Sequence, residues 1–296
     1  MPSRTTSNSP WKAPAAVMLI TLGCLAAAPS VPTPTSPASD YPTPTRLITR
    51  CFHAMGGPSA IQAVRSMAIN ATVSLEPDST PLARMSMAFD RAGRSLVRFN
   101  FLETNVDGQA ETSFGSNGDT AWEQIHPAEG GGWQLLDEED LAERIAANNW
   151  LGRLLRLGNE VEQMRTVGPE EFNGSPCWNI SFPSPQGPMN VFFDTQSKLL
   201  KGFRRTFQSP PLDDGISAPP QQLDIYFSHW KDVGELRLFH RVELVQRDIR
   251  MNITYDSLTL NDVPETTFDL PPQVQALVPA AKEPTDPPAQ EPPNDQ

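Results

Sequence analysis

The sequence predicts a mainly β (α+β) fold, built on one large antiparallel sheet of about 11 to 13 strands with a single apolar face. Two observations lead to this prediction. Apolar and polar residues alternate through most of residues 67–260, a pattern typical of strands that are buried on one face only. Parallel strands would be apolar on both faces, so the alternation favours antiparallel pairing.

Both ends of the chain have the composition of segments outside a fold. Residues 1–28 are interpreted as a signal segment, because two basic residues, Arg4 and Lys12, precede an apolar stretch that is too short to span a bilayer. Residues 29–45 form a Pro/Ser/Thr-rich linker, and residues 273–296 form a Pro-rich acidic tail that we expect to be disordered. The folded domain is therefore expected over residues 46–272, with no transmembrane span in the mature form.

The cysteines bear on localisation and on cross-linking. Thr21-Leu22-Gly23-Cys24 resembles a bacterial lipobox, which makes Cys24 a lipidation candidate; the alternative is ordinary signal-peptide cleavage near Ala26–Ala28. Cys51 and Cys177 are a candidate disulfide in an oxidising periplasm. Two buried free thiols are the favoured alternative, since nothing in the sequence brings the two residues together. We expect an exported, periplasmic protein, anchored in the membrane if Cys24 is lipidated.

Three segments have helical spacing. Leu47, Cys51 and Met55 predict a first helix that ends at the following glycine pair, and Pro58 begins a second, short helix. Acidic residues and then a leucine stripe predict a third helix over about residues 138–157.

Strands account for most of the remaining domain. Turn-forming residues at 90–94 and 106–108 separate them at hairpin spacing, and a Pro-rich loop covers residues 209–220. The clearest alternating segments are 67–75, 85–89, 97–101, 178–182, 189–193, 199–207, 223–227, 236–244 and 249–255.

The apolar face of this sheet is the candidate ligand-binding surface. Three short helices cover only part of so wide a sheet, and a soluble monomer tolerates a large exposed apolar patch only where the patch is used. An acyl chain inserted there would gain about 0.8 kcal/mol per CH₂ removed from water. The alternative for each residue is ordinary core packing. The candidates are Met85, Met87, Phe89, Val97, Phe99, Phe101, Met189, Val191, Phe193, Phe203, Ile225, Phe227, Leu238, Val242, Met251 and Ile253.

Four short segments carry a family resemblance. They are Gly118–Trp122, Phe193-Asp194 with Ser197–Leu200, Trp230–Gly234, and Asn261–Pro271. In this order they are similar to motifs of the periplasmic lipoprotein-carrier and outer-membrane lipoprotein-sorting superfamily (LolA–LolB-like). The resemblance implies a curved sheet or unclosed β-barrel with helices covering its concave face, and it implies a hydrophobic ligand.

Other functional classes find little support. The formal net charge of −12 disfavours nucleic acid and anionic membranes. The sequence contains no metalloprotease, nucleophile-elbow or phosphate-loop motif, so no cofactor, metal or catalytic residue is expected. His229 and His240 could approach each other across neighbouring strands as an acid–base or metal pair, but the simpler interpretation is two exposed strand residues near a turn.

These observations leave three hypotheses open. The leading one is a non-enzymatic, monomeric cell-envelope protein that binds lipid or lipoprotein acyl chains in its apolar face. The second is a membrane-tethered interaction or sensor module that contacts envelope proteins and whose concave face is filled by its own helices. The third is a hydrolase with unrecognised catalytic residues.

Overall fold

The computed structural model describes residues 41–77, 79–102, 111–125, 131–183, 189–207 and 220–278. The predicted signal segment, Cys24 and most of the predicted linker and tail lie outside these residues, as do the turn at 106–108 and most of the loop at 209–220. No helix in the described part is long and apolar enough to cross a membrane.

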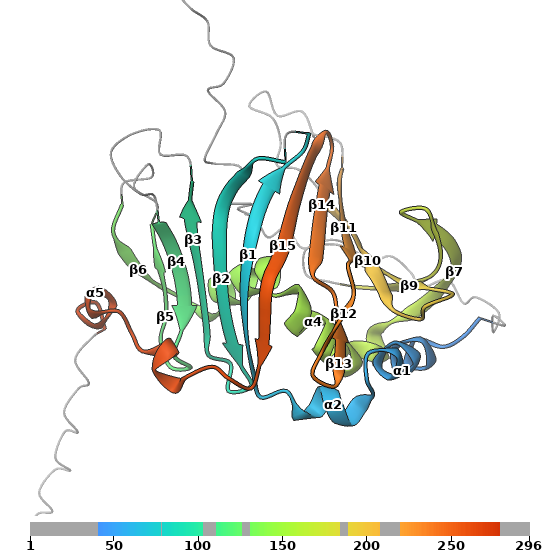
Figure 1. The fold of residues 1–296 in the computed structure, drawn as a ribbon, viewed down its shortest axis with the longest axis horizontal. Helices are drawn as coiled ribbons and strands as arrows, with labels where there is room; N and C mark the ends of the chain where they lie inside the picture. Colours follow the sequence, from blue (N-terminus) through green and yellow to red (C-terminus); the bar gives the residue numbers. More distant parts are fainter. Residues whose placement is uncertain are drawn as a thin grey trace, which may run out of the picture.

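One antiparallel sheet of thirteen strands dominates the fold (Figure 1). Its order is β6-β5-β4-β3-β2-β1-β15-β14-β11-β10-β9-β8-β7, so the sheet is open, with β6 and β7 at its edges. The strands are β1 Ser66–Leu75, β2 Pro81–Asp90, β3 Ser95–Phe101, β4 Glu111–Ser116, β5 Ala121–Gln124, β6 Trp133–Leu136, β7 Arg165–Phe172, β8 Ser175–Phe182, β9 Met189–Asp194, β10 Leu200–Phe207, β11 Gln221–Ser228, β14 Arg241–Gln246 and β15 Ile249–Leu260.

The predicted large antiparallel sheet is confirmed, but one of the strands predicted in its second half is wrong. The segment predicted as one strand over residues 236–244 is two strands. β13 (Leu236–Leu238) pairs with β12 (Lys231–Val233) in a separate hairpin, and the chain rejoins the main sheet only at Arg241. The apolar alternation continues through both strands because both bury their apolar side chains in the same core.

The pairing of β1 with β15 joins the two halves of the sheet. Met67 lies opposite Leu260, and the register continues to Leu75 opposite Met251. Each half is otherwise built from antiparallel neighbours, most of them adjacent in sequence. The first and last strands of the domain therefore lie together at the centre of the sheet, as the colours in Figure 1 show.

Helices pack against one face of the sheet, which we call the inner face. These are α1 (Pro44–Ala54), α2 (Pro58–Ala63), α3 (Glu138–Asn148) and α4 (Trp150–Arg156), followed by a 3-10 helix, η3 (Leu157–Gln163). Leu47 and Cys51 of α1, Ile61 of α2 and Leu154 of α4 share one buried cluster with the inward side chains of the sheet. The hydrophobic core therefore lies between these helices and the inner face.

The prediction of one continuous helix over residues 138–157 is wrong. Asn149 has φ −93° and ψ 62°, a non-helical conformation that separates α3 from α4. Its side chain is 4% exposed, and Asn149 Oδ1 accepts a hydrogen bond of 2.7 Å from the Gly152 amide. This is an N-cap, so the asparagine ends one helix and begins the next.

The opposite, outer face carries smaller apolar clusters. At one end, the C-terminal segment with η4 (Glu265–Phe268) and α5 (Pro272–Gln275) packs Phe268 and Val274 against Leu96 and Trp122. Val274 is fully buried, although it lies beyond the boundary predicted at residue 272. At the other end, Phe172 of β7, Cys177 of β8 and Phe192 of β9 form a separate cluster.

The glycine pair after α1 allows a close backbone contact with the β12–β13 hairpin. Gly56 has φ +121°, and a Cβ added there would lie 2.1 Å from Glu235 O. We expect Gly56→Ala to lower the free energy of unfolding by about 3 kcal/mol, through both steric overlap and backbone strain.

Gly93→Ala is the matched control, because Gly93 has φ +86° but no atom within 4 Å of an added Cβ. Gly93→Ala should lower the free energy of unfolding by about 1 kcal/mol, because it adds backbone strain without steric overlap. Urea unfolding measures both variants, and equal losses would contradict the proposed contact.

Candidate ligand-binding site

The structure brings all of the predicted ligand-binding residues into one apolar cluster. Phe99, Phe101 and Met251 are partly buried, and the others are buried. Leu238 contributes from the β12–β13 hairpin rather than from the main sheet. The apolar face inferred from the alternation is therefore one continuous surface.

The protein's own helices cover most of that surface. Leu151, Leu154 and Leu157 are 0–1% exposed in the same cluster. Cys51 and Met55, at the end of α1, are fully buried there as well. Among the residues that the structure describes, the helices therefore bury the apolar side chains in the middle of the inner face.

A pocket of about 410 Å³ lies where the helices meet the start of β1 and the end of β2. Its walls come from the end of α1, from α2, from α4 and η3, and from these two strand ends with the turn after β2. In Figure 1 these strand ends are at the bottom, where β1 begins beside α2 and β2 ends. The volume is within the range typical of small-molecule sites.

The pocket combines an apolar floor with a polar rim. Ile61, Val64, Met67 and Phe89 line it and also belong to the main apolar cluster. Around them, the polar and charged lining residues are Gln62, Arg65, Ser66, Asp90, Arg91, Asn149, Arg156 and Asn159. Such a pocket suits a ligand with an apolar part and a polar end.

Hydrogen bonds of the backbone and of one asparagine side chain hold the strand ends that line the pocket. The Arg91 amide donates to Arg65 O at 3.0 Å, which holds the turn after β2 against the start of β1. Asn261 Oδ1 accepts from the Arg65 amide at 2.6 Å, and Asn261 Nδ2 donates to Ala63 O at 3.1 Å. One asparagine therefore ties the connection between α2 and β1 to the end of β15.

The sequence predicted few of the residues that line this pocket. Of the predicted apolar residues, only Phe89 lines it. The rim was missed because Arg65, Arg91 and Arg156 lie far apart in the sequence and at the ends of elements, where a charged residue is ordinary. Only the pairing of β1 with β2 brings the first two together.

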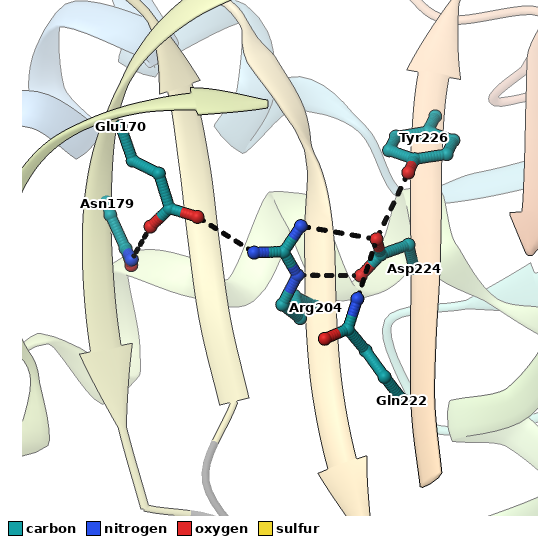
Figure 2. Close-up of polar contacts among 6 residues, drawn as sticks. All are labelled: Glu170, Asn179, Arg204, Gln222, Asp224 and Tyr226. Carbon is teal, nitrogen blue, oxygen red and sulfur yellow. Dashed lines mark hydrogen bonds and ion pairs between the residues drawn. The ribbon is translucent and has the colours of Figure 1, made fainter. Parts of the chain in front are cut away.

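A second polar cluster lies on the outer face, on β7, β8, β10 and β11 (Figure 2). Arg204 Nε and Nη2 donate to the two oxygens of Asp224 at 2.9 and 3.2 Å, and Arg204 Nη1 donates to Glu170 Oε1 at 2.8 Å. Tyr226 and Gln222 each donate to Asp224 Oδ2 at 3.1 Å. The guanidinium carbon also lies 5.3 Å from the ring centres of Phe172 and Phe192.

Every charge in this cluster has an opposite partner. Burial and the neighbouring Asp224 raise the pKa of Tyr226 to about 12, so its hydroxyl stays protonated as a donor. The hydrogen bond to Asp224 raises the pKa of Arg204 further. Tyr226 and Arg204 therefore serve as hydrogen-bond donors to the carboxylates of this cluster. The cluster therefore acts as a structural cross-link between strands.

His229 and His240 do lie close together, but through a backbone hydrogen bond. The His240 amide donates to His229 O at 3.1 Å, and a ring nitrogen of His240 bonds Leu238 O at 3.1 Å. His240 is buried, so its interpretation as an exposed residue is wrong. Burial lowers its pKa, and Lys231 and His229 lower it further. Among the residues described, no group of three or more His, Cys, Asp or Glu side chains is placed to hold a metal ion.

Cys51 and Cys177 are free buried thiols, so the candidate disulfide is wrong and the favoured alternative is confirmed. Cys51 lies in the inner cluster on α1, whereas Cys177 lies in the outer cluster on β8. The sheet separates them. Burial raises the pKa of Cys51 to about 12 and that of Cys177 to about 11.

Removing Arg204 should leave Asp224, which is 7% exposed, without its charge partner. We expect Arg204→Met to lower the free energy of unfolding by about 3 kcal/mol or more. The control is Arg84→Met, because Arg84 and Asp256 form an exposed ion pair and its loss should cost under about 1 kcal/mol. Similar small losses in both variants would show that the cluster does not cross-link the strands.

The folded protein should resist thiol reagents near neutral pH, because protonated, buried thiols react slowly. In a Cys24→Ser variant, we expect no rapid maleimide labelling in buffer and two labelled thiols in denaturant. Mass spectrometry counts the labels. Rapid labelling in buffer would contradict the buried placement, and no labelling in denaturant would indicate a disulfide.

Comparisons with known proteins find distant similarity to solved structures. No family model and no curated protein matches the chain. A LolA superfamily protein from Nitrosomonas europaea is similar at 10% identity and a TM-score of 0.47, over 78% of this chain and 99% of that chain. A putative outer membrane lipoprotein-sorting protein domain from Vibrio parahaemolyticus is similar at 11% identity and a TM-score of 0.45, over 76% of this chain and 95% of that chain. A DUF1329 family protein from Desulfovibrio piger is similar at 10% identity and a TM-score of 0.46, over 76% of this chain and 95% of that chain.

Proposed function

We propose that this protein binds lipid or acyl chains in the cell envelope, through the pocket between α1, α2, α4 and the start of β1. One observation carries the proposal. The apolar floor of the pocket, including Met67 and Phe89, belongs to the same cluster as the inner face of the sheet. A chain that enters the pocket therefore meets a continuous apolar surface, and each CH₂ it buries contributes about 0.8 kcal/mol.

A chain longer than the pocket can extend only by displacing a helix. Burying Leu151, Leu154 and Leu157 stabilises the helical cover by roughly 5 to 9 kcal/mol in total. An acyl chain with about twelve buried methylenes contributes about 10 kcal/mol. The two terms are of similar size, so a long chain can replace this segment on the inner face. Ligand length then decides whether the helical cover stays closed.

Localisation follows from the N-terminal segment. We propose export to the periplasm through residues 1–28 and, with lipidation at Cys24, anchoring at a membrane surface. An anchored protein would hold its ligand in place rather than carry it across the periplasm. The Pro/Ser/Thr-rich segment after Cys24 suits a tether of this kind.

The second candidate is an envelope interaction module with no lipid ligand. The observation that favours it is the close packing of α1 and α4 on the inner face, where Cys51, Met55 and Leu154 are fully buried. In that case the apolar face is simply the core of the domain. The two candidates differ in whether the pocket takes an acyl chain.

Blocking the pocket should abolish binding. Leu155 is partly buried in the pocket wall and packs against the apolar cluster, so Leu155→Trp fills part of the space and keeps an apolar side chain at that position. We expect at least a tenfold weaker Kd for monopalmitoylglycerol, which is uncharged and so tests the apolar floor alone. Equilibrium dialysis with labelled ligand measures this.

Val167→Trp is the matched control, because Val167 is 51% exposed on β7 and does not line the pocket. It should bind like the unmodified protein, and thermal unfolding should show that both variants fold. If the unmodified protein fails to bind, the lipid-binding proposal is overturned in favour of the interaction module. If Leu155→Trp binds as well as the control, the pocket is not the site.

A further inference from the structure

Three arginines stand in the polar rim of the pocket, and a purely hydrophobic ligand would not require them. We infer that the ligand is a single acyl chain that ends in an anionic group, a carboxylate or a phosphate, and that Arg65, Arg91 and Arg156 bind this group. The inference rests on the proposed function and adds the chemical class of the ligand.

The three arginines reach the pocket from separate parts of the chain. Arg65 precedes β1, Arg91 follows β2, and Arg156 ends α4. All three are exposed, and among the residues described no ion pair engages any of them. Their charges are therefore available to a ligand.

The backbone holds two of these arginines side by side. The Arg91 amide donates to Arg65 O at 3.0 Å, so the two residues are neighbours at the ends of the paired strands β1 and β2. Arg91 Nη2 also donates to Ile61 O at 3.4 Å, which directs the guanidinium toward α2. A guanidinium has five N–H donors, so this bond leaves others for an anion.

The carboxylate in the lining does not cancel these charges. Asp90 accepts from the Arg94 amide at 2.9 Å and from Arg94 Nε at 2.5 Å. Its negative charge is thus matched by a fourth arginine outside the lining. The lining keeps an excess of positive charge.

The positive charge of the pocket lining is opposite in sign to the net charge of the whole chain. The formal net charge is −12, so the protein as a whole repels anions, and only a local cluster attracts one. Guanidinium groups match carboxylate and phosphate oxygens through paired hydrogen bonds. A volume of about 410 Å³ also lies at the lower end of the range for small-molecule sites, which favours one chain over several.

The test compares ligands that differ in charge. Palmitate and palmitoyl-lysophosphatidylglycerol carry a carboxylate and a phosphate, and monopalmitoylglycerol carries the same chain without charge. We expect the unmodified protein to bind at least one anionic ligand about tenfold or more tightly than the neutral one. The preference should shrink as salt rises from about 0.05 to 0.5 M, because exposed charges are screened. Whichever anion binds more tightly identifies the headgroup.

Substitutions then locate the effect. The triple variant Arg65→Gln, Arg91→Gln, Arg156→Gln should bind the anions about tenfold or more weakly, while its Kd for monopalmitoylglycerol stays unchanged. Arg98→Gln is the matched control, because Arg98 is exposed on the outer face of β3, away from the pocket. It should keep the preference for anions.

The outcomes separate this inference from the proposed function. Equal binding of charged and neutral chains would overturn the role of the arginines and leave acyl binding intact. Loss of the preference in Arg98→Gln as well would also overturn it, because general charge would then explain the effect. Failure of every ligand to bind would overturn both proposals.

Discussion

The packing of helical side chains against the inner face of the sheet is the interaction on which the rest of the structure depends. A sheet with one apolar face has to bury that face, and here α1, α2 and α4 cover it with side chains such as Leu47, Ile61 and Leu154. The same contact decides where a ligand can enter. The helices seal the middle of the face and leave a pocket where they meet the ends of β1 and β2.

Polar interactions hold the helices and strands around the core in position. Asn149 breaks the helical segment into α3 and α4, and its side chain lines the pocket while it caps α4. Asn261 holds the connection between α2 and β1 in place. On the outer face, Arg204 and Asp224 cross-link strands near the β7 edge of the sheet. The two asparagines therefore hold in place elements that form the pocket.

The sequence predicts the sheet better than the site. Period-two alternation identifies strands such as β1, β2 and β11, because each has one buried face. It misses β4, where four consecutive residues from Ser113 to Ser116 are buried, so no alternation remains. It also merges β13 with β14, because burial in a common core hides the break. The arginine rim depends on long-range pairing and on the position of α4, which no local pattern encodes.

We propose that the pocket holds an acyl chain in the native protein. Native mass spectrometry of the full chain, extracted from membranes in mild detergent, tests it most directly, since bound ligand and N-terminal modification appear in one spectrum. The account predicts added mass that matches one lipid with a single acyl chain, released on activation in the gas phase. A spectrum of the protein without added ligand mass, together with failure to take up any acyl ligand afterwards, would contradict it.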